Sequence, residues 1–341
     1  MKALFIGGTG TISTAIIKRL ATQGGWDIWL LNRGSRPEVV PEGVHVIRAN
    51  IRDEDDVREK LSGMTFDVVS DFIGFTPDAV ERDIRLFTGK TGQFMYISSA
   101  SAYQKPVRSP FITEGTTLAN PYWQYSRDKI ACEEVLMRAY REDGFPVTII
   151  RPSHTYDERA LPVAVHGQMG FWQVVRRMLD GKQVIIHGDG SSLWHLTFNT
   201  DFAIGYTGLM GHPLAIGEAF QITGDEALTW NQIYQTIADA LHVPLKVCHV
   251  ASDWLAAAGK AEGYDFSGAL LGDKAVSVLF DNTKLKRLVP AMRTNVPFSQ
   301  GARIALEYII RHPEICQRED PVFDAWCDRV IAAQEQALAA F

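Results

Sequence analysis

Short apolar runs alternate with amphipathic stretches along the first 150 residues. The apolar runs have the length and composition of buried strands, at 2–7, 27–32, 44–50, 66–73, 93–99 and 146–152. The amphipathic stretches have helical spacing, at 14–24, 53–63, 77–89 and 126–144. Strands and helices in this alternating order predict a parallel sheet with helices on both of its faces.

The pattern changes after Arg151, where loops lengthen and prolines and aromatic residues become frequent. A helix is predicted at 171–181, a strand at 183–188, and mainly helices from residue 229 onward. We therefore predict an α/β fold: a Rossmann-type doubly wound parallel sheet with a smaller, mostly helical C-terminal domain. The predicted limits are 1–155 for the first domain, to which 197–225 returns, and 156–196 with 226–341 for the second domain.

The composition narrows the class of protein. Apolar residues make up 46% and charged residues 22% of the 341 positions, which is typical of globular proteins. The net charge of −6 disfavours a nucleic-acid-binding surface, and the absence of an 18-residue apolar stretch predicts no membrane contact. Four cysteines, all far apart in the sequence, predict free thiols, no metal site and a cytoplasmic location: Cys132, Cys248, Cys316 and Cys327.

The sequence GGTGTIS follows the first predicted strand and opens the first predicted helix. Gly7 permits a tight turn, and Gly10 permits close approach of phosphate groups to the backbone. The third position of this motif, normally glycine, is Ser13. The N–H groups at the helix start suit a pyrophosphate, so Gly7, Gly10, Thr11 and Ile12 are predicted to bind a dinucleotide. The first domain is therefore predicted to bind the cofactor and the second the substrate.

The second strand ends in Asn32-Arg33, where an acidic residue would hold the ribose of NAD. Asparagine does not repel a phosphate, and Arg33 can pair with a 2′-phosphate. We therefore expect NADP or NAD as cofactor, with NADP slightly favoured. The alternative is that Arg33 is a solvated loop cation. Asn50 and Ile51, at the end of the third strand, are predicted to flank the adenine.

The sequence YSRDK places Tyr125 and Lys129 four residues apart at a helix start. Side chains at this spacing share one face, and an ammonium beside a phenol lowers the pKa of the phenol. This pair predicts a general acid/base for a hydroxyl or carbonyl group. The fifth strand runs into YISSASAY, residues 96–103, so its serines lie at the sheet edge where ligands bind in α/β folds.

Together these motifs resemble the extended branch of the short-chain dehydrogenase/reductase superfamily, the NAD(P)-dependent epimerase/dehydratase family. The resemblance covers nearly the whole chain and implies an epimerase or oxidoreductase that acts by hydride transfer. It implies that Tyr125 transfers the hydroxyl proton, that Ser99 hydrogen-bonds the same oxygen, and that Lys129 tunes Tyr125. The sequence IIRPSHTYD matches the segment that passes the nicotinamide, which implies cofactor contacts from Pro152, Ser153 and His154.

Two departures from the family pattern concern the substrate. Dehydratases of the family carry an Asp-Glu pair where this chain has Ala100 and Ser101, which disfavours a 4,6-dehydratase. The family arginine that contacts a nucleotide-sugar diphosphate is here Trp194, and the following aspartate is His195. We therefore expect a free sugar, a glycoside or another polyol-like compound. The predicted substrate residues are Ser101, Trp123, Trp194 and His195.

Several alternatives stay open from the sequence alone. Trp194 is either a stacking platform or plain packing, His195 either a ligand or a surface residue, and Arg176 or Arg293 can replace the lost arginine. The alternative functions are an NADP-dependent dehydrogenase or reductase of another small hydroxy or carbonyl compound, and a non-catalytic RNA-binding relative. The LLNRG turn resembles relatives of stem-loop RNA-binding proteins, although the acidic charge disfavours nucleic acid as partner. The family resemblance is compatible with a homodimer.

Overall fold

The computed structural model describes residues 1–34, 36 and 39–340; Phe341, the last residue of the predicted second domain, lies outside them. Its main element is a seven-stranded parallel sheet in the order β11-β7-β5-β4-β1-β2-β3. The strands are β1 (Lys2–Ile6), β2 (Asp27–Asn32), β3 (His45–Arg48), β4 (Phe66–Asp71), β5 (Thr91–Ile97), β7 (Val147–Pro152) and β11 (Ala219–Ile222). The predicted α/β class and the doubly wound parallel sheet are confirmed.

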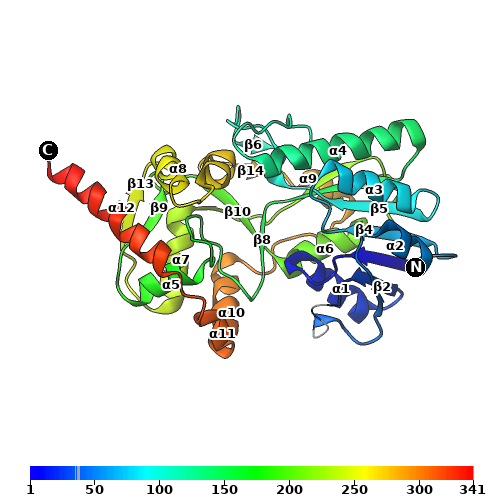
Figure 1. The fold of residues 1–341 in the computed structure, drawn as a ribbon, viewed down its shortest axis with the longest axis horizontal. Coiled ribbons are helices and arrows are strands. Elements are labelled where there is room, and N and C mark those ends of the chain that lie inside the picture. The colour runs from blue at the N-terminus through cyan, green and yellow to red at the C-terminus, as the bar shows by residue number, and fades with distance from the viewer. Residues whose placement is uncertain (35, 37–38, 341) are drawn as a thin grey trace.

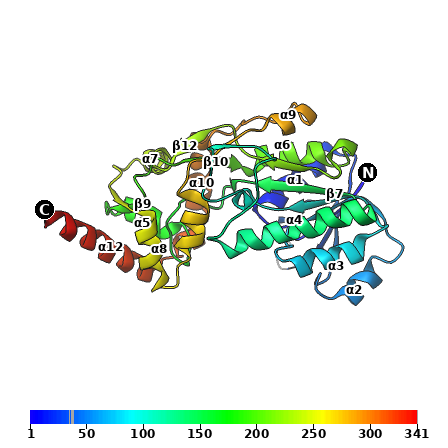
Figure 2. The same ribbon diagram turned by 90° about the horizontal axis from the view of Figure 1, so that it is seen from above.

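Helices cover both faces of this sheet (Figures 1 and 2). One face carries α2 (Glu54–Lys60), α3 (Pro77–Phe87) and α4 (Gln124–Asp143), and the other carries α1 (Thr11–Gln23) and α6 (Asn199–Leu209). The alternation of side chains along each strand explains the two layers. In β1, Leu4 and Ile6 pack toward α2 and α3, whereas Ala3 and Phe5 pack toward α1 and α6.

The second lobe contains small sheets as well as helices. One sheet joins β8 (His154–Tyr156), β10 (Leu193–Phe198) and β12 (Ala227–Thr229), and two strand pairs join β9 (Val184–His187) to β13 (Val247–Val250) and β6 (Phe111–Ile112) to β14 (Leu279–Phe280). The helices are α5 (Trp172–Leu179), α7 (Trp230–Leu241), α8 (Ser252–Lys260), η4 (Ser267–Lys274), α9 (Thr283–Leu288), α10 (Phe298–Arg311), α11 (Pro313–Cys316) and α12 (Pro321–Ala339), besides the short turns η2 (Ala100–Ala102) and η3 (Pro213–Ala215). Of these helices, α9 packs against the main sheet through Leu285.

The two lobes form an elongated molecule, with the N-terminus at the sheet end and α12 projecting from the other end (Figure 1). Segment 197–225 contributes α6 and β11 to the layers of the main sheet. The exact domain limits stay a prediction. Within the described residues, no helix combines the length and the apolar character that a membrane crossing requires.

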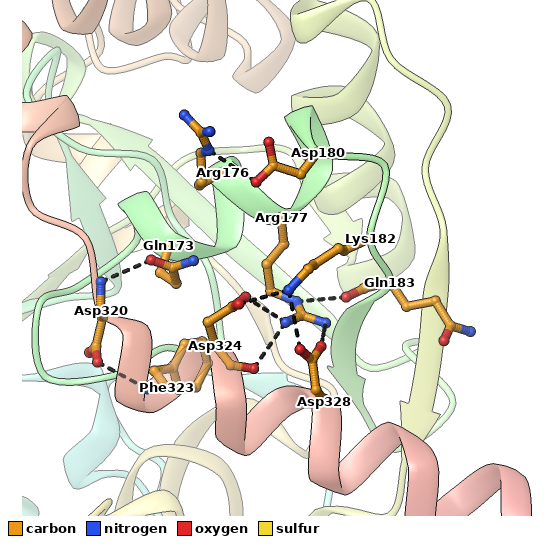
Figure 3. Close-up of polar contacts among 10 residues, drawn as sticks. All are labelled: Gln173, Arg176, Arg177, Asp180, Lys182, Gln183, Asp320, Phe323, Asp324 and Asp328. Atoms are coloured by element: carbon orange, nitrogen blue, oxygen red, sulfur yellow. Dashed lines mark hydrogen bonds and ion pairs between the residues drawn. The ribbon is translucent and has the colours of Figure 1, made fainter.

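The C-terminal helix α12 is attached to α5 by a cluster of ion pairs (Figure 3). The buried guanidinium of Arg177 lies 2.6 Å from Asp324 and 2.8 Å from Asp328, and Lys182 lies 2.8 Å from Asp324. At the start of α12, Asp320 accepts a hydrogen bond from the N–H of Phe323. Two carboxylates one turn apart on α12 thus hold this helix against Arg177 of α5 and the nearby Lys182.

Candidate functional site

The glycine-rich turn joins β1 to α1 at the carboxyl edge of the main sheet. Gly7 has a φ of +82°, a conformation that favours glycine, and a Cβ there would lie 2.5 Å from the side chain of Ile73. Ser13, which replaces the third motif glycine, is buried and accepts a hydrogen bond of 2.9 Å from the N–H of Gly10. The serine therefore stabilises the turn from within. A Cβ at Gly10 would meet only Ser13, so the outer surface of the turn is open to a ligand.

A cavity of about 670 Å³ lies beside this turn and is lined by Arg33, Asn50 and Ile51. The Arg33 side chain is exposed, as a residue that recognises a phosphate requires. The side-chain oxygen of Asn32 accepts a 2.8 Å hydrogen bond from the N–H of Gly34 and so shapes the turn after β2. The predicted adenosine residues therefore share one cavity, with Asn32 in a supporting position.

Two arginines that the sequence analysis missed also reach the glycine-rich turn. The Arg36 guanidinium lies 3.4 Å from the carbonyl oxygen of Thr9, and the Arg159 guanidinium lies 3.3 Å from the hydroxyl of Thr11. The NRGSR sequence after β2 signals Arg36, but Arg159 comes from a loop 148 residues beyond Thr11 and has no local signal. Arg36 adds positive potential where phosphate groups are predicted to bind, whereas the charge of Arg159 is compensated by its ion pair with Asp157.

A second cavity, of about 420 Å³, opens where the two lobes meet. Most of the predicted catalytic, nicotinamide and substrate residues line it: Ile12, Ser99, Ser101, Trp123, Tyr125, Lys129, Pro152, Ser153, His154 and Trp194. The structure thus brings together residues from β5, α4, β7, β8 and β10, and it adds Phe75, Asp273 and Lys274 to the walls.

Tyr125 stands beside a chain of serine hydroxyls. The N–H of Ser101 donates to the hydroxyl of Ser99 at 3.1 Å, and Ser126 donates to the hydroxyl of Ser101 at 2.7 Å. Burial raises the pKa of Tyr125; the neighbouring Ser99 hydroxyl opposes this effect, and the negative charge of Asp273 adds to it. The phenol is therefore protonated at neutral pH, with Ser99 close to its oxygen.

Lys129 is almost fully buried and uses its three N–H groups within the protein. It donates to the carbonyl oxygens of Gly74 at 2.8 Å and Ile97 at 2.7 Å, and to the hydroxyl of Tyr96 at 3.2 Å. Burial lowers the pKa of Lys129 to about 8. The expected lowering of the Tyr125 pKa is wrong for this arrangement. The ammonium lies 5.9 Å from the Tyr125 ring centroid, and burial of the phenol has the larger effect.

The segment after β7 forms the wall predicted to face the nicotinamide. The Ser153 hydroxyl lies 3.2 Å from the hydroxyl of Thr197, which holds β8 against β10. Burial lowers the pKa of His154 to about 3, and the nearby Lys274 ammonium acts in the same direction. His154 is therefore a neutral imidazole at physiological pH, able to accept or donate a hydrogen bond but not to neutralise an anion.

Trp194 and His195 are adjacent on β10 but have different surroundings. Trp194 borders the cavity, is 1% exposed, and has the Lys105 ammonium 5.9 Å from its ring centroid. His195 lies outside the cavity, and its two ring nitrogens are engaged by the carbonyl oxygen of Gly224 at 2.7 Å and the N–H of Phe280 at 3.4 Å. Successive side chains of a strand point to opposite faces, so the substrate contact predicted for His195 is wrong, as is its alternative placement on the surface.

The two arginines considered as replacements for the lost family arginine also lie away from the cavity. Arg176 is an exposed residue of α5 that pairs with Asp180 at 3.0 Å, and Arg293 donates to the side chain of Asn295. The positive charges near the substrate end of the cavity come instead from Lys274, in its wall, and from the buried Lys105. No sequence motif marks either lysine.

Comparisons with known proteins agree with this geometry. The family model for the NAD dependent epimerase/dehydratase family matches residues 3–223. The chain is 24% identical over 322 residues to the 2′-dehydrokanamycin reductase of Streptomyces kanamyceticus, covering 94% of this chain and 87% of that protein. It is 24% identical over 257 residues to the chloroplast stem-loop binding protein of 41 kDa b of Arabidopsis thaliana, covering 70% and 63%.

Among solved structures, the fold is similar to the UDP-glucuronic acid 4-epimerase of Bacillus cereus in complex with NAD. The TM-score is 0.71 at 19% identity, covering 92% of this chain and 99% of that one. The glycine-rich turn, the shared cavity at the carboxyl edge of the sheet and the family match over most of the chain lead to one conclusion. This protein is an enzyme of the NAD dependent epimerase/dehydratase family.

Proposed function

We propose that the enzyme oxidises a hydroxyl-bearing carbon of a sugar-like substrate to a carbonyl, or reduces such a carbonyl to the hydroxyl, with Tyr125 as acid/base. One observation carries the proposal: Ser99, Tyr125 and Lys129 border the same cavity as the segment 152–154, which ends β7 and begins β8. Tyr125 gives or takes the hydroxyl proton at its phenol oxygen, and Ser99 hydrogen-bonds the same substrate oxygen. Because burial raises the pKa of Tyr125, the resting phenol is an acid, which suits protonation of a carbonyl oxygen during reduction.

The residues at the glycine-rich turn fit a dinucleotide. The open surface at Gly10 and the first N–H groups of α1, at Thr11 and Ile12, suit a pyrophosphate. When bound, the dinucleotide supplies hydride transfer, and the protein supplies its position. Lys129 joins the loop after β4, at Gly74, to the end of β5, at Ile97, and it must exchange at least one of these acceptors to reach a ribose hydroxyl.

For the cofactor we propose NADP over NAD. Asn32 leaves no carboxylate at the ribose, and the exposed Arg33 borders the predicted adenosine cavity. Replacing Arg33 by Met is expected to weaken NADP binding about tenfold, the value of one charge-assisted hydrogen bond, and to leave NAD binding unchanged. Fluorescence titration of both cofactors measures this, with the exposed Arg108→Met as control. Equal or tighter NAD binding by the wild type would contradict the proposal.

The substrate we propose is a sugar ring without a nucleotide. In the family pattern, Trp194 takes the position of a diphosphate-binding arginine, and one relative, which matches over 94% of this chain, is a 2′-dehydrokanamycin reductase. The test panel is glucose, glucosamine, kanamycin and UDP-glucose, each with NADP and NAD. A net change in NADPH absorbance identifies an oxidoreductase, whereas product without net change identifies an epimerase. Strong turnover of UDP-glucose alone would refute the substrate class.

The role of Tyr125 is tested by Tyr125→Phe, with Tyr122→Phe as matched control. Tyr122 is exposed, lies three residues earlier and is not in the cavity wall. We expect Tyr125→Phe to lose at least 100-fold in kcat and to keep cofactor binding, the usual loss for an acid/base group. Tyr122→Phe should keep wild-type turnover. An active Tyr125→Phe enzyme would overturn the assignment.

The relationship to the Arabidopsis stem-loop binding protein favours RNA binding as a second candidate. Binding to phosphates releases counterions, so a specific RNA complex would weaken steeply between 50 and 200 mM salt. A gel-shift assay with a stem-loop RNA decides between the two functions. We further propose a cytoplasmic homodimer that associates through α3 and α4, which sedimentation of the purified enzyme would test.

A further inference from the structure

The cavity wall contributed by the second lobe ends in an ion pair. Asp273 and Lys274 close the helix η4 and border the cavity that holds Tyr125, and their side chains are only 11% exposed. The Lys274 ammonium lies 3.2 Å from one carboxylate oxygen of Asp273. The other carboxylate oxygen is buried and has no hydrogen-bond partner among the described residues. Neither residue belongs to a recognised motif.

A single amide fixes this wall relative to the catalytic residues. The side chain of Asn120 is buried, and its NH2 group donates to the carbonyl oxygens of Ser101 at 2.8 Å and Gly272 at 2.7 Å. Its oxygen accepts from the N–H groups of Tyr122 at 3.1 Å and Trp123 at 3.2 Å. Asn120 thus uses its full hydrogen-bonding capacity to join the end of β5, the start of α4 and the end of η4.

Glycines allow η4 to pack directly on this junction. A Cβ at Gly268 would lie 2.1 Å from the ring of Trp123, and a Cβ at Gly272 would lie 3.0 Å from the Cβ of the same residue. Asp273 therefore has a defined position in the cavity wall, next to the start of α4. Its charge is close enough to Tyr125 to raise the pKa of the phenol.

The position of Asp273 is unfavourable for folding alone. A negative charge at the C-terminal end of a helix opposes the helix dipole, and a buried carboxylate with an unpaired oxygen bears a desolvation cost. Nearby, the Lys105 ammonium is also buried without a hydrogen-bond partner in the described part of the chain. Lys105 does not border the cavity, and its ammonium lies 5.9 Å from the ring centroid of Trp194, which does. Asp273 belongs to the cavity wall, and a buried acceptor left unpaired at such a wall indicates a binding role.

We propose that Asp273 accepts a hydrogen bond from a donor group of the substrate, a hydroxyl or an ammonium on the ring whose reacting oxygen exchanges a proton with Tyr125. Lys274 donates to a neighbouring ring oxygen. The inference rests on the proposed function, because it names the substrate chemistry of the same cavity. A sugar ring offers donors and acceptors together, and its apolar face suits the Trp123 ring. A diphosphate placed against Asp273 would meet its negative charge in a poorly solvated site and could not donate a hydrogen bond to it, so this carboxylate, unlike the paired Lys274, disfavours nucleotide sugars.

The test compares Asp273→Asn with Asp265→Asn, the same substitution at the exposed start of η4. Asp265 accepts a hydrogen bond from the N–H of Gly268, which an asparagine oxygen also accepts. For the sugar that turns over, we expect Asp273→Asn to raise KM 10- to 100-fold and to change kcat less than threefold, the loss of a charge-assisted hydrogen bond. Comparing glucose with glucosamine distinguishes a hydroxyl donor from an ammonium donor. The loss of affinity in Asp273→Asn should be larger for the sugar whose ammonium contacts Asp273 than for one that contacts it through a hydroxyl.

Two further measurements depend on the charge of Asp273 itself. In Asp273→Asn, the alkaline limb of the pH–rate profile moves to lower pH, because the charge that raises the pKa of Tyr125 is gone. The same variant binds UDP-glucose several-fold more tightly by calorimetry, because the repulsion is removed. An unchanged KM together with unchanged UDP-glucose binding would overturn the inference, as would equal effects from Asp265→Asn.

Binding is also measured in the Tyr125→Phe background with cofactor present, so that the inference does not depend on turnover. If Asp273→Asn weakens sugar binding there while the wild type shows no turnover, the proposed function fails and the inference stands. If the wild type turns over a sugar and Asp273→Asn turns over the same sugar with an unchanged KM, only the inference fails. If no panel sugar binds the wild type, the inference is refuted. Lys274→Gln, expected to raise KM at least fivefold, replaces Asp273→Asn if its circular dichroism differs from wild type.

Discussion

A buried ion pair beneath the catalytic cavity gives a sharp prediction about stability. Glu133 on α4 and Arg151 on β7 form two hydrogen bonds, of 2.6 and 2.9 Å, and their side chains are 4% and 7% exposed. The same carboxylate accepts a 2.5 Å hydrogen bond from Ser98, the residue before Ser99. Glu133→Gln keeps the shape of the side chain but turns an NH2 group or a neutral oxygen toward the guanidinium.

Removing one charge of a buried pair leaves the other uncompensated, and such losses amount to about 3–5 kcal/mol. The entropy of unfolding for a chain of this length is about 0.7 kcal/mol/K, so Tm falls by about 4–7 °C. The catalytic efficiency also falls, because the Ser98 hydroxyl, one residue before Ser99, loses its charged acceptor. Glu134→Gln is the matched control, since Glu134 is the exposed neighbour on the same helix.

Thermal unfolding followed by circular dichroism, with turnover measured in parallel, is the assay. Replacing both members of the pair by methionine should recover part of the stability lost in Glu133→Gln, because the uncompensated charge is gone. A Tm for Glu133→Gln within 1 °C of that for Glu134→Gln would refute the reasoning. A double variant less stable than Glu133→Gln would show instead that the pair is a net source of stability.

Two further predictions concern the anchor of α12 and the buried lysine. Arg177→Met should lower the free energy of unfolding by about 2–3 kcal/mol and expose the C-terminal helix to protease, because its partners on α12 lose their buried cation (Figure 3). The control Arg176→Met, at an exposed position, should change the free energy of unfolding by less than about 0.5 kcal/mol. Equal protease sensitivity of the two variants would contradict this prediction. Burial lowers the pKa of Lys129 to about 8, so between pH 8 and 10.5 the unfolded chain binds more protons than the folded chain. The free energy of unfolding of the wild type, relative to that of Lys129→Met, should therefore rise with pH across this range by up to about 3 kcal/mol. A flat difference in chemical denaturation from pH 7.5 to 10.5 would refute the second prediction.

Much of the molecule follows from local patterns. The alternating order of apolar strands and amphipathic helices predicts helices on both faces of the sheet, and the structure confirms it, with Leu4 and Ile6 on one face of β1 and Ala3 and Phe5 on the other. The predicted bounds of β2, at 27–32, agree with those observed. These features depend on residues near one another in the chain, whose spacing directly determines which faces are apolar.

The spacing within one strand did not determine what each side chain meets. Trp194 and His195 follow each other on β10, yet the first borders the cavity and the second is bonded to Gly224 and Phe280. Which face of β10 looks into the cavity depends on strand pairing with β8 and β12, segments that lie far from it in the sequence. The alternation of side chains along a strand defines its two faces, but it does not determine which of the two borders a cavity built from distant segments.

The sequence by itself determined the sheet, the glycine-rich turn and the Tyr125–Lys129 pair, because each is specified within one strand, turn or helix. The tertiary structure alone decided the protonation states and the cavity wall that η4 contributes. Lys129 has a lowered pKa because the folded chain buries it among carbonyl oxygens from the loop after β4 and from β5. Asp273 reaches the cavity from 148 positions beyond Tyr125 because Asn120 holds η4 against α4. Contacts between segments so far apart depend on packing and loop paths, which no local pattern encodes.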